Sequence, residues 1–237
     1  MSNHTVGSKS ITEGIARYSS LCLMEKKYGR KGLLDIYQSL GRDYSWGRRT
    51  AFDGEHDLLH ANAGYLWNTK AGMVLFGLGK TIGEDSLNAA LHAFKEKWGG
   101  RNGGPYAGSP DLYKVLEGHV PDSLRYYLAD SWLRVAMYDN RVTEASVTPQ
   151  GKDSVYRVTV TVDVSKHYTD KGSDTTVNDY IDLAVWDKAG ILTRRTYRWT
   201  SGQHTIGLIL HQQPTAVEID PDRKLMDLNI ENNKKEF

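Results

Sequence analysis

The residues best suited to chemistry begin with one acid near the start of the chain, Glu13. It stands in the segment Thr12–Tyr18, TEGIARY, among small and apolar residues and, in a helical reading, near a helix N-terminus. Most glutamates in such a position only complement the helix dipole. A catalytic zinc ion needs about three protein ligands and an open position for water. One carboxylate is therefore too few, and metal chemistry at Glu13 would need ligands from elsewhere.

A second set of residues has metal-ligand spacing by itself. His56 and His60 are four positions apart, which puts two imidazoles on one face of a helix, and Glu84 follows further along the chain. However, residues 48–62 are polar and include Gly54, which predicts a loop rather than a ligand helix. The acid between the histidines is aspartate, which is one methylene shorter than the usual glutamate base. A self-contained metallohydrolase using these residues is kept only as an alternative.

The whole run Gly7–Gly29, GSKSITEGIARYSSLCLMEKKYG, resembles the zinc aminopeptidases of the membrane alanyl aminopeptidase family, the gluzincins. The likeness is greatest to the bacterial branch fused to ABC-transporter permeases. Residues 65–91, YLWNTKAGMVLFGLGKTIGEDSLNAAL, look like the family's helix with Y-x-K-G followed by I-G-E-x-x-x-N. The strings PDSLRYYLADSW and YDN resemble that branch's last helix and its entry to a β domain. The resemblance thus covers nearly the whole chain.

The resemblance implies a zinc site of which this chain holds one ligand. In the family, the glutamate of E-G-x-A-x-Y is the third protein ligand, and Glu13 is the matching position. The first two ligands come from H-E-x-x-H on a helix just upstream, and this sequence contains neither that motif nor the exopeptidase motif G-x-M-E-N. We expect the chain to be the downstream part of a peptidase, cut after the metal-binding helix. Zinc is the cofactor of the intact family, and we expect none to bind this chain tightly.

The family's catalytic tyrosine is replaced here. In Y-x-K-G the tyrosine donates a hydrogen bond to the oxyanion of the tetrahedral intermediate, a contribution of roughly 3 kcal/mol to the barrier. Aligned on Lys70, that position is Asn68, and the glycine position is Ala71. Tyr65, one helical turn earlier, is a candidate substitute, although a core aromatic is the commoner role for such a residue. The sequence therefore leaves open whether the longer protein is an enzyme or a non-catalytic interaction module.

Bulk composition excludes several classes of function. The chain has 237 residues with a net charge of +1, so no nucleic-acid footprint is expected. No run approaches the roughly 18 apolar residues of a membrane-spanning helix. The resemblance implies a peptide substrate in the intact protein, an upstream catalytic half or permease portion as a partner, and a membrane-associated, extracytoplasmic setting. No residue of the chain indicates a compartment.

Hydrophobic spacing predicts an α+β protein with more than one domain. Residues 1–140 are expected to be helical, and the resemblance implies that they are the C-terminal part of a thermolysin-like catalytic domain. Residues 141–220 are expected to form an immunoglobulin-like β-sandwich, and residues 221–237 a polar, peripheral tail. The predicted helices include one closed by Gly29 and Gly32, a second over Leu33–Leu40 that ends near Gly41, and a third, buried one over Tyr65–Leu78. Alternating apolar residues predict two core strands, one carrying Tyr156, Val158, Val160, Val162 and Val164 on one face and the next carrying Ile181, Leu183 and Val185.

Overall fold

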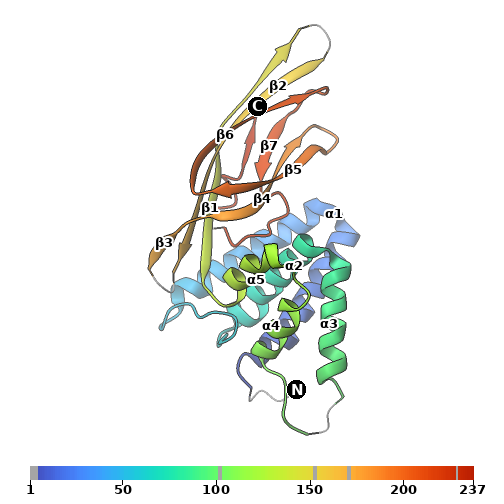
Figure 1. The fold of residues 1–237 in the computed structure, drawn as a ribbon, viewed down its shortest axis with the longest axis vertical. Helices are drawn as coiled ribbons and strands as arrows, with labels where there is room; N and C mark the ends of the chain where they lie inside the picture. The colour runs from blue at the N-terminus through green and yellow to red at the C-terminus, as the bar shows by residue number, and fades with distance from the viewer. Residues whose placement is uncertain (1–4, 101–102, 152–153, 170–171, 228) are drawn as a thin grey trace. The chain divides into compact units, whose positions relative to one another are not determined.

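The computed structural model describes residues 5–100, 103–151, 154–169, 172–227 and 229–237, which form two compact units. The helical unit comprises Met1–Val135 and the β unit comprises Ala136–Phe237 (Figure 1). The division lies five residues before the boundary predicted after residue 140. Strand β1 (Ala136–Gln150) already pairs with the next strand at Ala136, whose partner is Tyr168.

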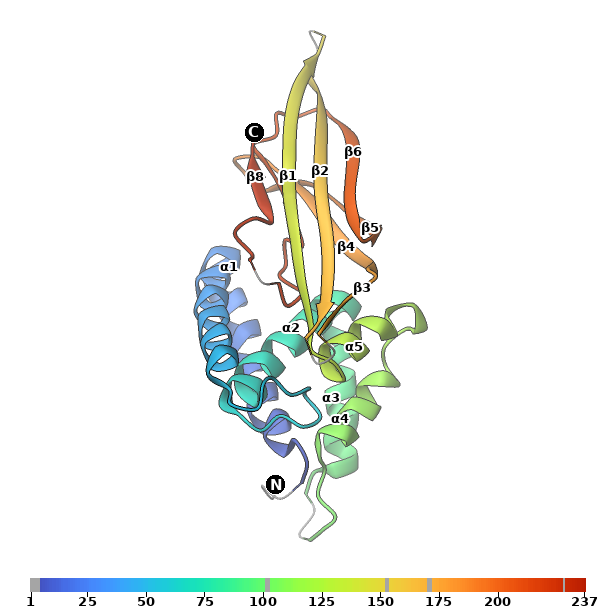
Figure 2. The ribbon, with the colours of Figure 1, turned by 90° about the vertical axis from the view of Figure 1, so that its left-hand side faces the viewer.

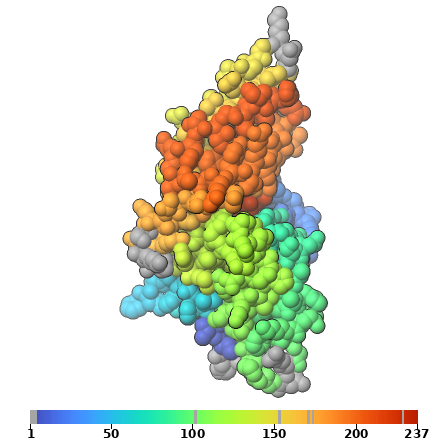
Figure 3. Space-filling view, in the orientation of Figure 1, coloured from blue at the N-terminus to red at the C-terminus, as the bar shows by residue number. Residues whose placement is uncertain are grey.

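Seven helical segments make up the described part of the helical unit. They are α1 (Ser8–Thr50), the π-helical η1 (Tyr65–Lys70), α2 (Ala71–Ile82), α3 (Glu84–Trp98), α4 (Ser109–Glu117), the short 3-10 helix η2 (Asp122–Leu124) and α5 (Arg125–Trp132). Helix α1 contacts η1 and α2, and α4 contacts both α3 and α5. The surfaces of α3, α4 and α5 adjoin one another in green in Figure 3.

Helix α1 corrects the prediction of two separate helices. A kink does occur at Gly29, which has φ 65° and ψ −171°, a conformation that glycine adopts without steric cost. The helix does not end at Gly41, however, but continues to Thr50. Tyr37, Leu40 and Tyr44 are all buried and continue one apolar stripe across Gly41. Because an interior glycine costs only about 1 kcal/mol relative to alanine, this packing is enough to carry the helix through it.

The buried helix predicted over Tyr65–Leu78 is present as two joined segments. Its first part, η1, is π-helical, and its second part, α2, continues to Ile82. Most of α2 is buried on every side, including Leu75 and Leu78, which have no exposed surface. The apolar core of the helical unit therefore surrounds α2, as the sequence indicated.

The β unit contains two four-stranded antiparallel sheets. One joins β1 to β2 (Val155–Tyr168), which also pairs with β3 (Ser173–Thr175) and β6 (Gly202–Leu210). The other has the order β5 (Ile191–Thr200), β4 (Asn178–Trp186), β7 (Ala216–Ile219) and β8 (Lys234–Glu236). Figure 2 shows β1, β2 and β6 side by side. The predicted core faces of β2 and β4 are confirmed for the valines from Val158 to Val164 and for Ile181, Leu183 and Val185, which are at most 2% exposed, whereas Tyr156 at the start of β2 is only half-buried.

The predicted peripheral tail is instead part of the β unit. Strand β8 pairs with β7, and the backbone N–H groups of Tyr138 and Val142 in β1 donate to the carbonyls of Met226 and Asn232. The tail thus supplies hydrogen-bond partners that the strands would otherwise lack. Its polar composition concealed this role, because main-chain pairing does not require apolar side chains.

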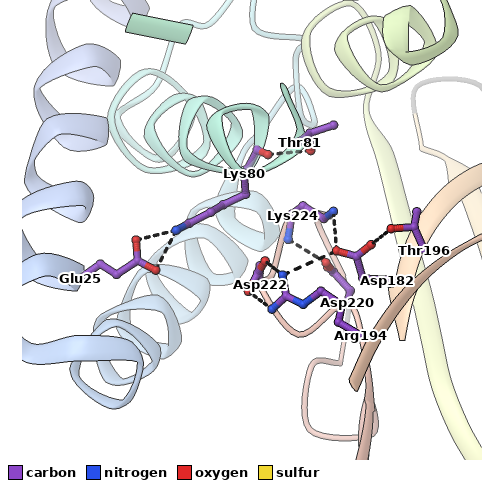
Figure 4. Close-up of polar contacts among 10 residues, drawn as sticks. Glu25, Lys80, Thr81, Asp182, Arg194, Thr196, Asp220, Asp222 and Lys224 are labelled. Atoms are coloured by element: carbon purple, nitrogen blue, oxygen red, sulfur yellow. Dashed lines mark hydrogen bonds and ion pairs between the residues drawn. The ribbon is translucent and has the colours of Figure 1, made fainter. Parts of the chain in front are cut away.

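Ion pairs join the loop after β7, at the start of this C-terminal segment, to strands β4 and β5. The Lys224 Nζ atom lies 3.0 Å from an oxygen of Asp182, and the Arg194 guanidinium donates to Asp222 at 2.9 Å (Figure 4). Burial by itself would raise the pKa of Asp182, but the hydrogen bonds from Thr196 and Lys224 hold that pKa below its ordinary value. The network therefore keeps Asp182 ionised and the loop after β7 attached to β4 and β5.

Candidate functional site

The structure brings together two of the predicted site residues, Glu13 and Asn68. Glu13 projects from the second turn of α1 and is exposed, whereas Asn68 lies in η1 and is partly buried. The Asn68 Nδ2 atom donates to the Glu13 Oε2 atom at 3.3 Å, across 55 positions of sequence. The carboxylate is thus solvent-accessible but adjoins the predicted third helix.

Arg17 fixes the orientation of the Asn68 amide. Its Nε and Nη2 atoms donate to Asn68 Oδ1 at 3.0 Å and 2.7 Å. With the amide oxygen held by the guanidinium, the amide nitrogen is the end that meets Glu13. Arg17 was missed among the predicted site residues. The signal was present, because positions four apart on a helix share one face and Arg17 follows Glu13 by four.

Small residues let α1 and α2 approach closely enough to form this cluster. A Cβ atom on Gly14 would lie 2.9 Å from the Cβ of Ala71, and any side chain at Gly72 would overlap Arg17. The crossing therefore requires glycine at both positions. Beside it, the Lys9 ammonium lies 4.3 Å from the centroid of the Trp67 ring, within cation–π range.

Tyr65, the candidate substitute for the missing tyrosine, belongs to a different cluster. Its ring centroid is 6.1 Å from that of Tyr44, and its buried hydroxyl makes no hydrogen bond with a described residue. Burial, together with the nearby carboxylates of Glu55 and Asp53, raises the pKa of Tyr65 to about 12. The structure thus pairs Tyr65 with Tyr44 and Glu55, and it joins Asn68 rather than Tyr65 to Glu13.

A buried charged cluster around Glu55 was not predicted. The Glu55 side chain is 3% exposed and accepts hydrogen bonds from Lys70 Nζ at 2.7 Å and from the Tyr44 hydroxyl at 2.7 Å. Arg48 Nε adds an ion pair at 2.8 Å. Burial and the Glu55 charge raise the pKa of Tyr44 well above its usual value. Lys70, 1% exposed, thus has its charge compensated by Glu55, and the cluster ties η1 to the end of α1 and the following loop.

The two-histidine motif does not assemble with Glu84. His56 pairs with Asp53 at 2.8 Å, His60 pairs with Asp57 at 2.9 Å, and Glu84 pairs with Lys26. In the described parts of the chain, no group of three or more histidine, cysteine, aspartate or glutamate side chains is arranged to hold a metal ion. The prediction of a loop is correct for residues 51–62, while residues 48–50 belong to α1.

Comparisons with known proteins leave the family resemblance as a prediction. Neither protein-family models nor curated proteins give a match to this chain. Among the described residues, no helix combines the length and the apolar character that crossing a bilayer demands.

Proposed function

We propose that the chain is the downstream portion of a zinc-aminopeptidase-like protein in which Glu13 occupies a metal-ligand position. The observation that carries this proposal is the contact between Asn68 Nδ2 and Glu13 Oε2 at 3.3 Å. The resemblance pairs these two positions as a metal ligand and an oxyanion donor, and the fold brings them together. Under this proposal the helical unit is part of a thermolysin-like domain and the β unit is an immunoglobulin-like sandwich.

Glu13 suits one ligand position, and the described residues place no group of three metal-ligating side chains around it. Its carboxylate is exposed, and only the Oε2 atom accepts a hydrogen bond from a described residue, at a long distance. The Oε1 atom is thus available to a metal ion. When bound by two further histidines, zinc would supply an activated water for attack on a peptide carbonyl. Asn68 would direct its N–H toward the same point, which places a weak donor beside the reacting group.

A non-catalytic interaction module is the second candidate, and Arg17 favours it. Its two hydrogen bonds lock the Asn68 amide so that the nitrogen is directed to Glu13 rather than free to reach an oxyanion. In this alternative the peptidase-like fold would bind a partner, such as the permease portion of a transporter-associated protein. Membrane association outside the cytoplasm belongs to the same proposal.

Peptidase assays separate the two candidates. The natural gene is expressed with whatever residues precede position 1, and the product is compared with the 237-residue chain on aminoacyl-coumarin substrates. The enzyme proposal predicts hydrolysis by the longer product only, loss of it in Glu13→Gln and a gain in Asn68→Tyr. Glu96→Gln, at an exposed acid on α3, is the matched control. No hydrolysis by the longer product, even with Asn68→Tyr, would leave the interaction module as the function.

A further inference from the structure

A pocket of about 620 Å³ lies at the other end of α1 from Glu13. Its wall is formed by one face of α1, by the loop that follows it, and by Tyr65 and Thr69 of η1. Pockets of about 300–1,000 Å³ are typical of small-molecule sites. The cavity is therefore large enough for a small ligand or one side chain of a peptide.

The pocket is built by a close helix crossing. Asp43, Trp46, Gly47 and Thr50 recur at helical spacing and line it from α1. A Cβ atom on Gly47 would lie only 2.5 Å from the Cβ of Tyr65, so glycine is required where η1 crosses α1. The Tyr65 ring is fixed there against Tyr44. The pocket's inner wall is therefore set by packing rather than by a mobile side chain.

The charge of the lining is negative. Asp43 and Asp53 are the charged side chains among the described residues that line the cavity, and no lysine, arginine or histidine is among them. Asp53 pairs with His56 at 2.8 Å, and the hydrogen bond from His56 lowers the pKa of its carboxyl. Asp43 is exposed and has no hydrogen-bond or ion-pair partner in the described structure. One carboxylate at the pocket is thus uncompensated.

Aromatic rings stand next to these carboxylates. Trp46 is 66% exposed and Phe52 is fully exposed, and both line the pocket with the two aspartates. Tyr65 adds a third ring to the lining. Indole and phenyl faces attract organic cations, and a nearby carboxylate adds an ion pair.

We propose that this pocket binds an organic ammonium group, with Trp46 and Phe52 as cation–π surfaces and Asp43 as its counter-charge. An anionic ligand would be repelled by both aspartates, and a neutral apolar ligand would leave the uncompensated carboxylate unused. The site is separate from the Glu13–Asn68 cluster and does not depend on the peptidase-like function.

Isothermal titration calorimetry of the full chain tests the proposal. The probes are butylammonium and acetylcholine, with butanol as a neutral analogue of the first. Saturable binding of the cations, weakened by added salt, is expected, and Trp46→Ala and Asp43→Asn should each weaken it by roughly two- to fivefold. The matched controls are Tyr28→Ala, an exposed ring on α1, and Asp35→Asn, an exposed acid on α1; both should bind as the wild type does.

A comparison of a lysine-containing peptide with butylammonium identifies the source of the ammonium group. Tighter binding of an acetylated lysine-containing tripeptide than of butylammonium would assign the pocket to a basic peptide side chain, and the reverse would assign it to a free amine. Because Trp46 and Asp43 are exposed, unchanged circular dichroism in both variants is expected. Equal binding of butanol, undiminished binding by both variants, or no saturable binding of any cation would overturn the proposal.

Discussion

Two glutamates of the helical unit, Glu13 and Glu55, both contact side chains of η1 but in opposite environments. Glu13 is exposed and accepts one long hydrogen bond from Asn68. The Glu55 side chain is 3% exposed and is surrounded by a lysine, an arginine and a tyrosine hydroxyl within 2.8 Å. Glu55 is therefore committed to holding the fold, whereas Glu13 retains an oxygen for an external group. The difference shows that accessibility, not the mere presence of a carboxylate, distinguishes the candidate functional acid.

The largest expected difference between the two glutamates is in how much each contributes to the free energy of unfolding. Glu55→Gln leaves the Lys70 ammonium buried with its counter-charge removed, and such a loss typically costs about 3–5 kcal/mol. Glu13→Gln changes an exposed group and should alter the free energy of unfolding by no more than about 0.5 kcal/mol. Urea unfolding followed by far-ultraviolet circular dichroism measures both. Equal losses for the two variants would erase the proposed distinction.

The two tyrosines beside Glu55 should respond in opposite directions. Tyr44→Phe removes a hydroxyl that donates to the Glu55 carboxylate and should cost about 1.5–3 kcal/mol. Tyr65→Phe removes a buried hydroxyl without a partner and should be neutral or stabilising by about 1 kcal/mol. The same unfolding measurement applies. A destabilised Tyr65→Phe variant would indicate that this hydroxyl takes part in the cluster.

A carboxylate of the β unit, Asp227, shows the effect of desolvation on an acid that has no ion-pair partner among the described residues. Desolvation raises its pKa to about 6, against the opposing hydrogen bonds from the N–H groups of Asn229 and Asn140. The folded state therefore binds more protons than the unfolded state between about pH 4 and 6, and stability should fall as pH rises through that window, by at most about 1.4 kcal/mol per unit.

Hydrogen exchange of the Leu183 amide, in the buried strand β4, measures this dependence. Asp227→Asn should reduce the slope. Part of the slope should remain in this variant, because Asp220 is fully buried and its pKa is also raised mainly by burial. A slope of the opposite sign would show that the hydrogen bonds to Asp227 outweigh its desolvation.

A small effect on stability is also expected at Arg17. Arg17→Ala removes both hydrogen bonds to Asn68 Oδ1, but the cluster is near the surface, so the free energy of unfolding should change by less than about 1 kcal/mol. The Asn68 side-chain amide should then lose its fixed orientation. Nuclear magnetic resonance of that amide should show faster exchange with water, and an unchanged rate would mean that Glu13 alone holds it.

Local patterns predicted the parts of the fold that depend on local packing. Alternating valines defined the buried face of β2, and an all-round apolar run defined α2. The continuation of α1 beyond Gly41 could not be predicted by the rule that glycine ends helices, because contacts from Tyr37 and Tyr44 override it. The pairing of β8 with β7 was hidden because backbone hydrogen bonds carry no side-chain signature.

The candidate site was only partly predictable from the sequence, because its contacts join residues that are far apart along the chain. Glu13 and Asn68 are far apart in sequence, and only the family resemblance connected them. Arg17 could have been found from its helical spacing to Glu13. The contact between Glu55 and Lys70 arises from the path of the loop after α1, and no local pattern specifies that path.

Zinc content of the natural gene product, expressed with any residues that precede position 1, tests the central claim most directly. The protein is dialysed against metal-free buffer and analysed by plasma mass spectrometry, alongside Glu13→Gln and the control Glu96→Gln. If Glu13 is a metal-ligand position, the wild type and the control retain about one zinc ion per chain, as a three-ligand site should, and Glu13→Gln loses most of it. Equal zinc in all three proteins, or none in the wild type, would contradict the account.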